Sequence, residues 1–256
     1  MPEGDSVAGH AEMLRPILVG RRVEAVAGTA PSVRSNSARI LDARMEAVRT
    51  VGKHLIVDLS TGYSIRIHLG MPGRWRVHGR GTPPGGSARL VLTTTTHHAA
   101  CYSAPTIEVD RTAAIDAQLA RLGPDLLGDF DVDEFIRRAR LIPDTAVADL
   151  LLNQRVLAGI GNVYKSEVLF LERVNPATAV SALDDETLAS VARRAGRLLS
   201  ANVGSGPRTT TGRRAGGQDL WVYGRGGRPC RRCGAPIAQD TRGDRVTYWC
   251  PTCQPL

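Results

Sequence analysis

Residues 230–253, CRRCGAPIAQDTRGDRVTYWCPTC, contain four of the five cysteines of the chain, arranged as two Cys-x2-Cys pairs. The pairs are separated by sixteen residues and consist of Cys230, Cys233, Cys250 and Cys253. This spacing predicts one tetrahedral zinc site, because each pair offers two thiolates from one tight turn and the segment between them can form a β-hairpin. Four thiolates leave no open position, so we expect one structural Zn2+ that stabilises a zinc-ribbon domain over residues 220–256.

Two disulfides are the alternative use of these cysteines, and an intracellular setting disfavours them. Cys101, the fifth cysteine, falls in a predicted strand and is expected to be a buried core thiol.

The segment upstream of the ribbon, residues 131–203, predicts a helical domain. Apolar residues recur at helical spacing in residues 131–140, 146–156, 163–174 and 183–201. A glycine-rich turn ends one helix at Gly159, and Asn162 is a good cap for the next. Glycines and free N–H groups at such a helix start could admit a phosphate, although an ordinary helical hairpin explains them equally. Residues 204–219 are rich in Gly, Thr and Arg and predict a flexible basic loop.

The first 116 residues predict a β-sandwich with a flanking helix. The helix is expected from Asp5 to Val19, with a kink or an early end at Pro16. Strands separated by Gly and Pro are expected at residues 23–26, 45–59, 63–69, 75–78, 88–95 and 101–109. The prediction is therefore an α+β multi-domain fold, in which domain 1–116 precedes the helical domain, the basic loop and the zinc ribbon.

The formal net charge of +8 and the isoelectric point near 9.8 favour a polyanionic partner. Lys53 and Lys165 are the only lysines among 33 basic residues, so these positions either need an ammonium group or survive by chance. No apolar run is long enough to span a membrane, and the N-terminus lacks the apolar segment of a signal peptide. We therefore expect a cytoplasmic protein, associated with the nucleoid in a bacterium.

Five motifs in order along the chain resemble the formamidopyrimidine-DNA glycosylase/endonuclease VIII family. They are Met1–Asp5 (MPEGD), Val51–Leu55 (VGKHL), Ile67–Met71 (IHLGM), Gln154–Asn162 (the helix–two-turns–helix motif) and Arg245–Cys253 in the zinc finger. Pro2-Glu3-Gly4, Trp75-Arg76 and Tyr102-Ser103 resemble the endonuclease VIII branch more closely. The resemblance implies a base-excision-repair DNA glycosylase with AP lyase activity, acting on damaged DNA and favouring oxidised pyrimidines.

The resemblance also implies a catalytic pair at the chain start. Removal of Met1 would leave Pro2 with a terminal amine, and such groups titrate near ~8, so part of it is unprotonated at neutral pH. This amine would attack C1′ of the sugar, expel the base and form an iminium ion that allows strand cleavage. Glu3 would serve as the acid/base partner.

Further residues take roles by the same resemblance. Lys53 would bind a phosphate beside the lesion and assist elimination, and Asn162 and Arg245 would bind the same phosphate region. His68 would be a further phosphate contact or a structural histidine. Met71 would be the apolar wedge that fills the gap left by the extruded nucleotide, unless it is a core methionine.

The sequence departs from the family pattern at three places. The family usually has a carboxylate a few residues after Glu3, and here Asp5 and Ser6 occupy that neighbourhood, so the second acid is shifted or missing. Residues 104–108 lack the arginine and phenylalanine of the formamidopyrimidine branch, and Gly70-Met71-Pro72 is not the bulkier polar and aromatic wedge of endonuclease VIII. The protein would then stabilise the base opposite the lesion poorly. We therefore expect it to prefer single-stranded or bubble DNA, or to act mostly on abasic sites.

Two other protein classes are alternatives: a non-catalytic zinc-ribbon DNA-binding protein, and an RNA- or ribosome-associated one. Pro2, Glu3 and Lys53 argue against both, because binding alone needs no free proline amine. We expect a monomer that uses no small-molecule cofactor.

Overall fold

The structure is a computed structural model that describes residues 2–204, 206–213, 217–242 and 245–256. The chain divides into two compact units, Met1–Arg121 and Leu122–Leu256. Within the described ranges, no helix combines the length and apolar character that a membrane span requires.

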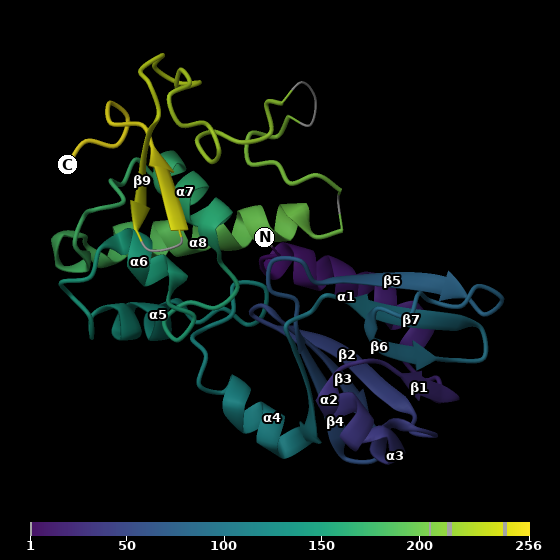
Figure 1. Cartoon of the computed structure of the whole chain (residues 1–256). Coiled ribbons are helices and arrows are strands. Elements are labelled where there is room, and N and C mark those ends of the chain that lie inside the picture. Colours follow the sequence, from purple (N-terminus) through teal and green to yellow (C-terminus); the bar gives the residue numbers. More distant parts are fainter. Residues whose placement is uncertain (1, 205, 214–216, 243–244) are drawn as a thin grey trace. The chain divides into compact units, whose positions relative to one another are not determined.

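The elements of the first unit, except β8, are labelled in Figure 1. In chain order they are α1 (Gly4–Leu18), β1 (Ala25–Ala27), α2 (Pro31–Ser35), α3 (Ser37–Ile40), β2 (Met45–Val51), β3 (His54–Leu59), β4 (Tyr63–His68), β5 (Arg74–Gly79), β6 (Ala88–Thr93), β7 (His97–Tyr102), β8 (Thr106–Arg111) and α4 (Thr112–Leu119).

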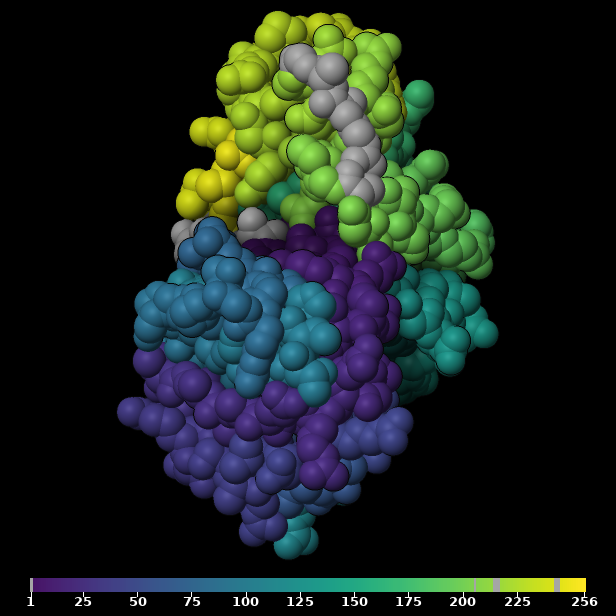
Figure 2. Space-filling model, turned by 90° about the vertical axis from the view of Figure 1, so that its right-hand side faces the viewer, coloured from purple at the N-terminus to yellow at the C-terminus, as the bar shows by residue number. Residues whose placement is uncertain are grey.

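The strands of this unit form two antiparallel four-stranded sheets, ordered β1-β6-β7-β5 and β2-β3-β4-β8. Leu14 of α1 and inward side chains of both sheets, including Leu55, Ile65 and Leu90, form one buried core. The predicted β-sandwich with a flanking helix is therefore confirmed. Residues of β5 to β7, in blue, lie next to the purple N-terminal segment in the space-filling view (Figure 2).

The predicted strand over residues 45–59 is wrong in one respect, since it is a hairpin. Gly52 and Lys53 form a two-residue turn that pairs Val51 with His54 across β2 and β3. Gly52 has φ +56°, and a positive φ at the first central residue is typical of a type II′ turn. The apolar pattern continues on both sides of these two residues, which is why Lys53 was placed in a strand.

Other boundaries also differ from the prediction. Residues 88–109 form three strands instead of two, and α2, α3 and α4 were not predicted because they are too short for a clear helical period. α1 continues past Pro16 and ends at Leu18, because a proline in the last turn removes only one helical hydrogen bond.

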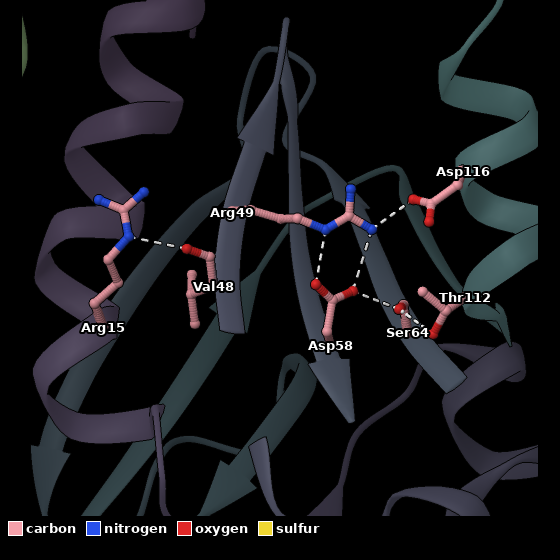
Figure 3. Close-up of polar contacts among 7 residues, drawn as sticks. All are labelled: Arg15, Val48, Arg49, Asp58, Ser64, Thr112 and Asp116. Carbon is pink, nitrogen blue, oxygen red and sulfur yellow. Dashed lines mark hydrogen bonds and ion pairs between the residues drawn. The ribbon is translucent and has the colours of Figure 1, made fainter. Parts of the chain in front are cut away.

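Polar contacts attach both flanking helices to the second sheet (Figure 3). Arg15 of α1 donates from Nε to the Val48 carbonyl of β2 at 2.9 Å. Arg49 of β2 bonds Asp58 of β3 at 2.7 Å and Asp116 of α4 at 2.6 Å. The Arg15 contact joins α1 to the sheet whose strands lead to Lys53 and His68, and the Arg49 contacts join α4 to the same sheet.

The elements of the second unit are mostly helical. In chain order they are α5 (Val132–Ala139), α6 (Val147–Leu152), α7 (Asn162–Leu171), a 3-10 helix η1 (Val180–Ala182), α8 (Asp185–Asn202), β9 (Ala238–Arg242) and β10 (Arg245–Trp249). α5 and α8 are capped by Asp131 and Asp184, whose carboxylates accept N–H bonds from Glu134 and Thr187. β9 and β10 pair as the antiparallel hairpin expected between the cysteine pairs. The separate boundaries 131–203, 204–219 and 220–256 within this unit stay a prediction.

Helix α7 is the centre of the second unit. Every residue from Asn162 to Phe170 is buried, including Lys165 and Glu167. Its apolar side chains belong to two cores, one shared with α5, α6 and α8 and another with the zinc ribbon. A helix buried on all sides must satisfy its polar groups internally, and this requirement shapes the site described next.

Candidate functional site

The chain start lies at the N-terminus of α1. Glu3 is the N-cap residue of this helix, its carbonyl accepts N–H bonds from Ser6 and Val7, and its side chain is completely buried. Pro2 directly precedes it and is partly exposed. Asp5 is also buried, at 3 % exposure, so a second carboxylate does lie in the first turn of α1. The structure thus places the predicted nucleophile beside a carboxylate that is shielded from water.

Lys53 and His68 lie at the same end of the strands of the second sheet. Lys53 occupies the β2–β3 turn, and His68 ends β4, where it pairs with His54 of β3. The His54 and His68 rings stand 5.1 Å apart. Burial, followed by the charges of Lys53 and Arg66, lowers the pKa of His68, so this ring is neutral near pH 7. Burial, then the charges of His68, Arg66 and Lys53, lower the pKa of His54 to about 4.

The turn between β4 and β5 carries Met71. Its side chain is 67 % exposed, so the alternative of a core methionine is wrong. His68 Nδ1 accepts the Gly70 N–H at 3.3 Å, and the Gly73 N–H bonds the Leu69 carbonyl at 2.9 Å. Gly70 has φ +58°, and a Cβ there would lie 2.6 Å from a side-chain carbon of Pro105. Met71 is therefore an exposed apolar side chain on a tight, well-fixed turn.

The turn between α6 and α7 is closed by one glutamine. Gln154 Nε2 donates to the Leu152 and Ile160 carbonyls, and its Oε1 accepts the Gly159 N–H at 3.1 Å. The prediction that Asn162 caps α7 is wrong, because Gly161 is the N-cap residue and no side-chain cap bond forms there. Asn162 instead donates from Nδ2 to the Val246 carbonyl of β10 at 2.8 Å.

The contact between Asn162 and β10 brings two predicted phosphate-binding residues onto neighbouring segments. Arg245 is the first residue of β10 and immediately precedes Val246. Lys165 Nζ donates to Asn162 Oδ1 at 2.6 Å and to Thr247 Oγ1 at 2.7 Å. Asn162 and Lys165 are 5 % and 1 % exposed. The sequence indicated that Lys165 is unusual but could not show its contact with Thr247, which lies on a strand 82 residues away.

Glu167 is a buried residue that the sequence analysis missed. Its carboxylate accepts the backbone N–H groups of Trp221, Val222 and Tyr223, each at 2.8 Å, and the Thr210 hydroxyl. Burial raises the pKa of Glu167, and these four donors oppose the shift. The carboxylate thereby anchors the segment that leads into the zinc ribbon. A lone glutamate within an apolar helix gives no local signal of such a role.

The four cysteines of the ribbon lie together. All four Sγ atoms are within 4.8 Å of one another, with Cys230–Cys253 at 4.0 Å and Cys233–Cys250 at 3.5 Å. Tetrahedral zinc with Zn–S bonds of about 2.3 Å requires S–S separations of about 3.8 Å, so the donor set fits one Zn2+. The site is closed and structural, as predicted.

Two arginines of the ribbon have internal partners. Arg231 donates to the Leu220 and Gly217 carbonyls, and the Arg232 guanidinium stacks on Phe170 at 4.5 Å from the ring centroid. The positive charge of the ribbon is therefore partly used to hold its own loops on α7.

Comparison with known proteins identifies the family. The N-terminal domain model of formamidopyrimidine-DNA glycosylase matches residues 1–106, its H2TH domain model matches residues 122–213, and the zinc finger found in FPG and IleRS matches residues 227–256. The chain belongs to the formamidopyrimidine-DNA glycosylase/endonuclease VIII family. The H2TH match contains the α6–α7 turn, and the zinc-finger match contains all four cysteines.

Relatives in this family are similar over the whole chain. A probable endonuclease 8 2 of Streptomyces coelicolor is 40 % identical over 99 % of this chain and 94 % of its own length. The DNA-(apurinic or apyrimidinic site) lyase Nei2 of Mycolicibacterium smegmatis is 41 % identical over 99 % of both. A formamidopyrimidine-DNA glycosylase of Geobacter sulfurreducens is 30 % identical. The prediction that the chain is closer to the endonuclease VIII branch is confirmed.

Solved structures confirm the predicted fold. The Lactococcus lactis Fpg in complex with abasic-site DNA superposes with a TM-score of 0.86 over 100 % of both chains, at 23 % identity. At this identity the likeness supports the three-part architecture of sandwich, helical motif and zinc finger.

Proposed function

We propose that this protein is a base-excision-repair DNA glycosylase with AP lyase activity that removes oxidised bases, with pyrimidines favoured. The observation that carries the proposal is the buried Glu3 carboxylate directly after Pro2, within the segment that matches the family's N-terminal domain. A carboxylate shielded from water is suited to exchanging protons with a reacting group beside it. The relatives named as endonuclease 8, lyase and glycosylase support the same activity.

The reaction follows from an amine next to a buried acid. After loss of Met1, the Pro2 nitrogen attacks C1′, the bond between C1′ and the base breaks, and the base leaves with a proton supplied through Glu3. The amine then gives up its proton, the C1′–O4′ bond breaks with O4′ taking up a proton, and the sugar ring opens to an iminium ion that makes the C2′ proton acidic. Removal of this proton expels the 3′ phosphate by β-elimination, and water then releases the sugar fragment and restores the Pro2 amine.

Phosphate binding in the first unit falls to Lys53 and His68. The Lys53 ammonium lies on a hairpin turn, and its positive charge attracts a DNA phosphate. Because His68 Nδ1 accepts from Gly70, the neutral ring carries its proton on Nε2 and can donate it to a phosphate oxygen. Exposed Met71, also in the first unit, acts as the wedge in the duplex. In the second unit, Asn162 and Arg245 bind phosphate.

Borohydride trapping tests the proposal. Incubating the wild-type protein with an abasic-site oligonucleotide and borohydride should give a covalent adduct, whose peptide mass places the link on Pro2. The Pro2→Gly variant should lose most of the adduct, and Glu3→Gln should lower base excision more than adduct formation on a preformed abasic site. DNA binding by the wild type without any adduct would instead support the non-catalytic zinc-ribbon alternative.

Substrate preference is a second part of the proposal. Residues 104–108 offer no arginine or phenylalanine to support the opposite base, so we expect single strands, bubbles or abasic sites to be cut efficiently. Cleavage of one lesion in matched single-stranded and duplex oligonucleotides checks this, and a strong duplex preference would contradict it. We also propose a monomer that needs no small-molecule cofactor and acts in the cytoplasm at the bacterial nucleoid.

A further inference from the structure

Lys165 is a charged side chain inside a fully buried helix. It is 1 % exposed, and its Nζ reaches Asn162 Oδ1 at 2.6 Å and Thr247 Oγ1 at 2.7 Å. Burying an ammonium is costly unless its N–H groups are bonded, so these contacts are what make the position tolerable. Apart from Lys53, all the other Lys/Arg positions of the chain are arginine. A compact ammonium donates to both of these close acceptors, and a guanidinium, with its planar fork of donors, is not interchangeable with it.

The contact with Lys165 determines how the Asn162 carboxamide is oriented. An ammonium can only donate, so the amide atom that faces it must be Oδ1. The opposite end, Nδ2, then faces β10 and donates to the Val246 carbonyl at 2.8 Å. Nδ2 carries a second hydrogen, which this orientation leaves for another acceptor. Lys165 thereby decides which end of the amide is presented as a donor.

The same ammonium also joins α7 to β10. Thr247, its second acceptor, lies two residues after Arg245 on β10. Asn162 bonds the residue between them. Three consecutive residues of the strand, beginning with Arg245, are therefore placed relative to α7 by a pair of polar side chains one helical turn apart.

We propose that Lys165 is a positioning residue for DNA binding, which orients the Asn162 carboxamide. The inference rests on the proposed function, in which Asn162 and Arg245 bind the DNA phosphate. At 1 % exposure, Lys165 acts through Asn162 and not by its own contact with DNA.

The central experiment uses Lys165→Met in the full-length, zinc-loaded protein. Methionine keeps the length of the side chain but cannot donate, so Asn162 Oδ1 loses the bond that orients the amide. The dissociation constant for a duplex with a non-cleavable abasic-site analogue should rise about tenfold, the size expected for loss of a charge-assisted hydrogen bond. The rate of borohydride adduct formation at saturating abasic-site DNA should stay within about twofold, because Pro2 and Glu3 are untouched. Wild-type DNA affinity of the folded variant would overturn the inference.

A double-mutant cycle separates this role from general stabilisation. If Lys165 acts through Asn162, then Lys165→Met should weaken DNA binding further by less than about twofold once Asn162→Ala is present. Additive losses from the two substitutions would overturn the inference.

Ser166→Ala is the matched control. Ser166 Oγ accepts the Tyr248 N–H at 3.4 Å and donates to the Asn162 backbone carbonyl at 3.3 Å. It therefore contacts the same helical turn and the same strand, but not the side-chain carboxamide of Asn162. This variant should bind DNA within about twofold of wild type, because weak bonds at this length contribute little. A loss equal to that of Lys165→Met would mean that general packing of β10 matters, which would overturn the inference.

Lys165→Gln covers the case in which the methionine variant fails to retain zinc or to unfold cooperatively. Its amide can still donate to one acceptor, so its loss of affinity should be about threefold and should vanish on the Asn162→Ala background. A loss that persists unchanged on that background would overturn the inference. Absence of a wild-type adduct would refute the proposed function separately, because the affinity measurements do not depend on catalysis.

Discussion

Lys53 and Met71 of the first unit stand on tight turns, whereas Asn162 and Lys165 of the second unit are buried within α7. The turns are held by bonds between residues close in sequence, such as the Gly73 N–H to the Leu69 carbonyl. The polar side chains of α7 are held by partners on β10, more than 80 residues further along. Changes on the turns should therefore alter function at little cost in stability, and changes in α7 and its partners should alter both.

Removal of zinc should give the largest effect and should affect the second unit selectively. Structural zinc sites contribute on the order of 10 kcal/mol to the folding of small domains, and the ribbon has only a small core of its own. Chelation, or Cys250→Ser, should abolish DNA binding and expose residues 220–256 to protease, while the N-terminal sandwich stays protected. Mass-spectrometric mapping of the fragments checks this outcome. Retained DNA affinity in protein shown to be free of zinc would contradict it.

Glu167→Ala should give the next largest effect. The substitution leaves the N–H groups of Trp221, Val222 and Tyr223 without their acceptor; the Val222 N–H is buried and the other two are partly buried, and a buried unsatisfied donor costs about 1–3 kcal/mol. We expect a loss of about 3 kcal/mol or more in the free energy of unfolding, measured by urea denaturation. Glu172→Ala is a control, because that carboxylate is only partly buried and is bonded by Ser190 and Arg194 side chains. Equal losses in the two variants would contradict the anchoring role of Glu167.

His54 shows whether a polar side chain of the first unit can also affect stability, because it is a partly buried titratable group there. Its folded-state pKa of about 4 lies below the unfolded value of 6.5, so the unfolded chain binds more protons between these values. Stability should therefore fall as the pH drops from about 6.5 to about 4. Relative to His54→Phe, the wild type should lose about 1–2 kcal/mol between pH 7 and pH 5, allowing for partial screening. Urea unfolding of both proteins at the two pH values measures this difference, and parallel pH curves would refute the shift.

Met71→Ala should give the smallest effect on stability. A side chain that is 67 % exposed makes few core contacts, so the free energy of unfolding should change by less than about 0.5 kcal/mol. Base excision from a duplex should nevertheless fall about tenfold, because an unfilled gap makes nucleotide extrusion more costly. Cleavage of single-stranded abasic DNA should change little. A marked fall in the melting temperature would show that Met71 belongs to the core after all.

Much of the architecture was predictable because its signals are local. Cysteine spacing, the Gly and Pro that separate strands, and the apolar period of α5 and α8 each depend on a few neighbouring residues. The predicted sandwich, helical domain and zinc ribbon were confirmed for this reason. The β2–β3 turn was missed because Gly52-Lys53 interrupts an apolar pattern that otherwise continues.

The candidate site was predicted unevenly. Pro2, Glu3, Lys53 and the four cysteines could be named from motifs, although the structure does not test the catalytic roles. The burial of Glu3 and Asp5, the exposure of Met71 and the ring contact between His54 and His68 were not predictable. Each depends on which elements pack together, and no period or spacing along the chain encodes it.

The amino-acid sequence by itself determined the family, the order of the three architectural parts and the ligands of the zinc. Only the tertiary structure decided what Asn162, Lys165 and Glu167 bind. A buried polar group must find a partner wherever the fold brings one, and here the partners named outside α7 lie 43 to 84 residues away along the chain.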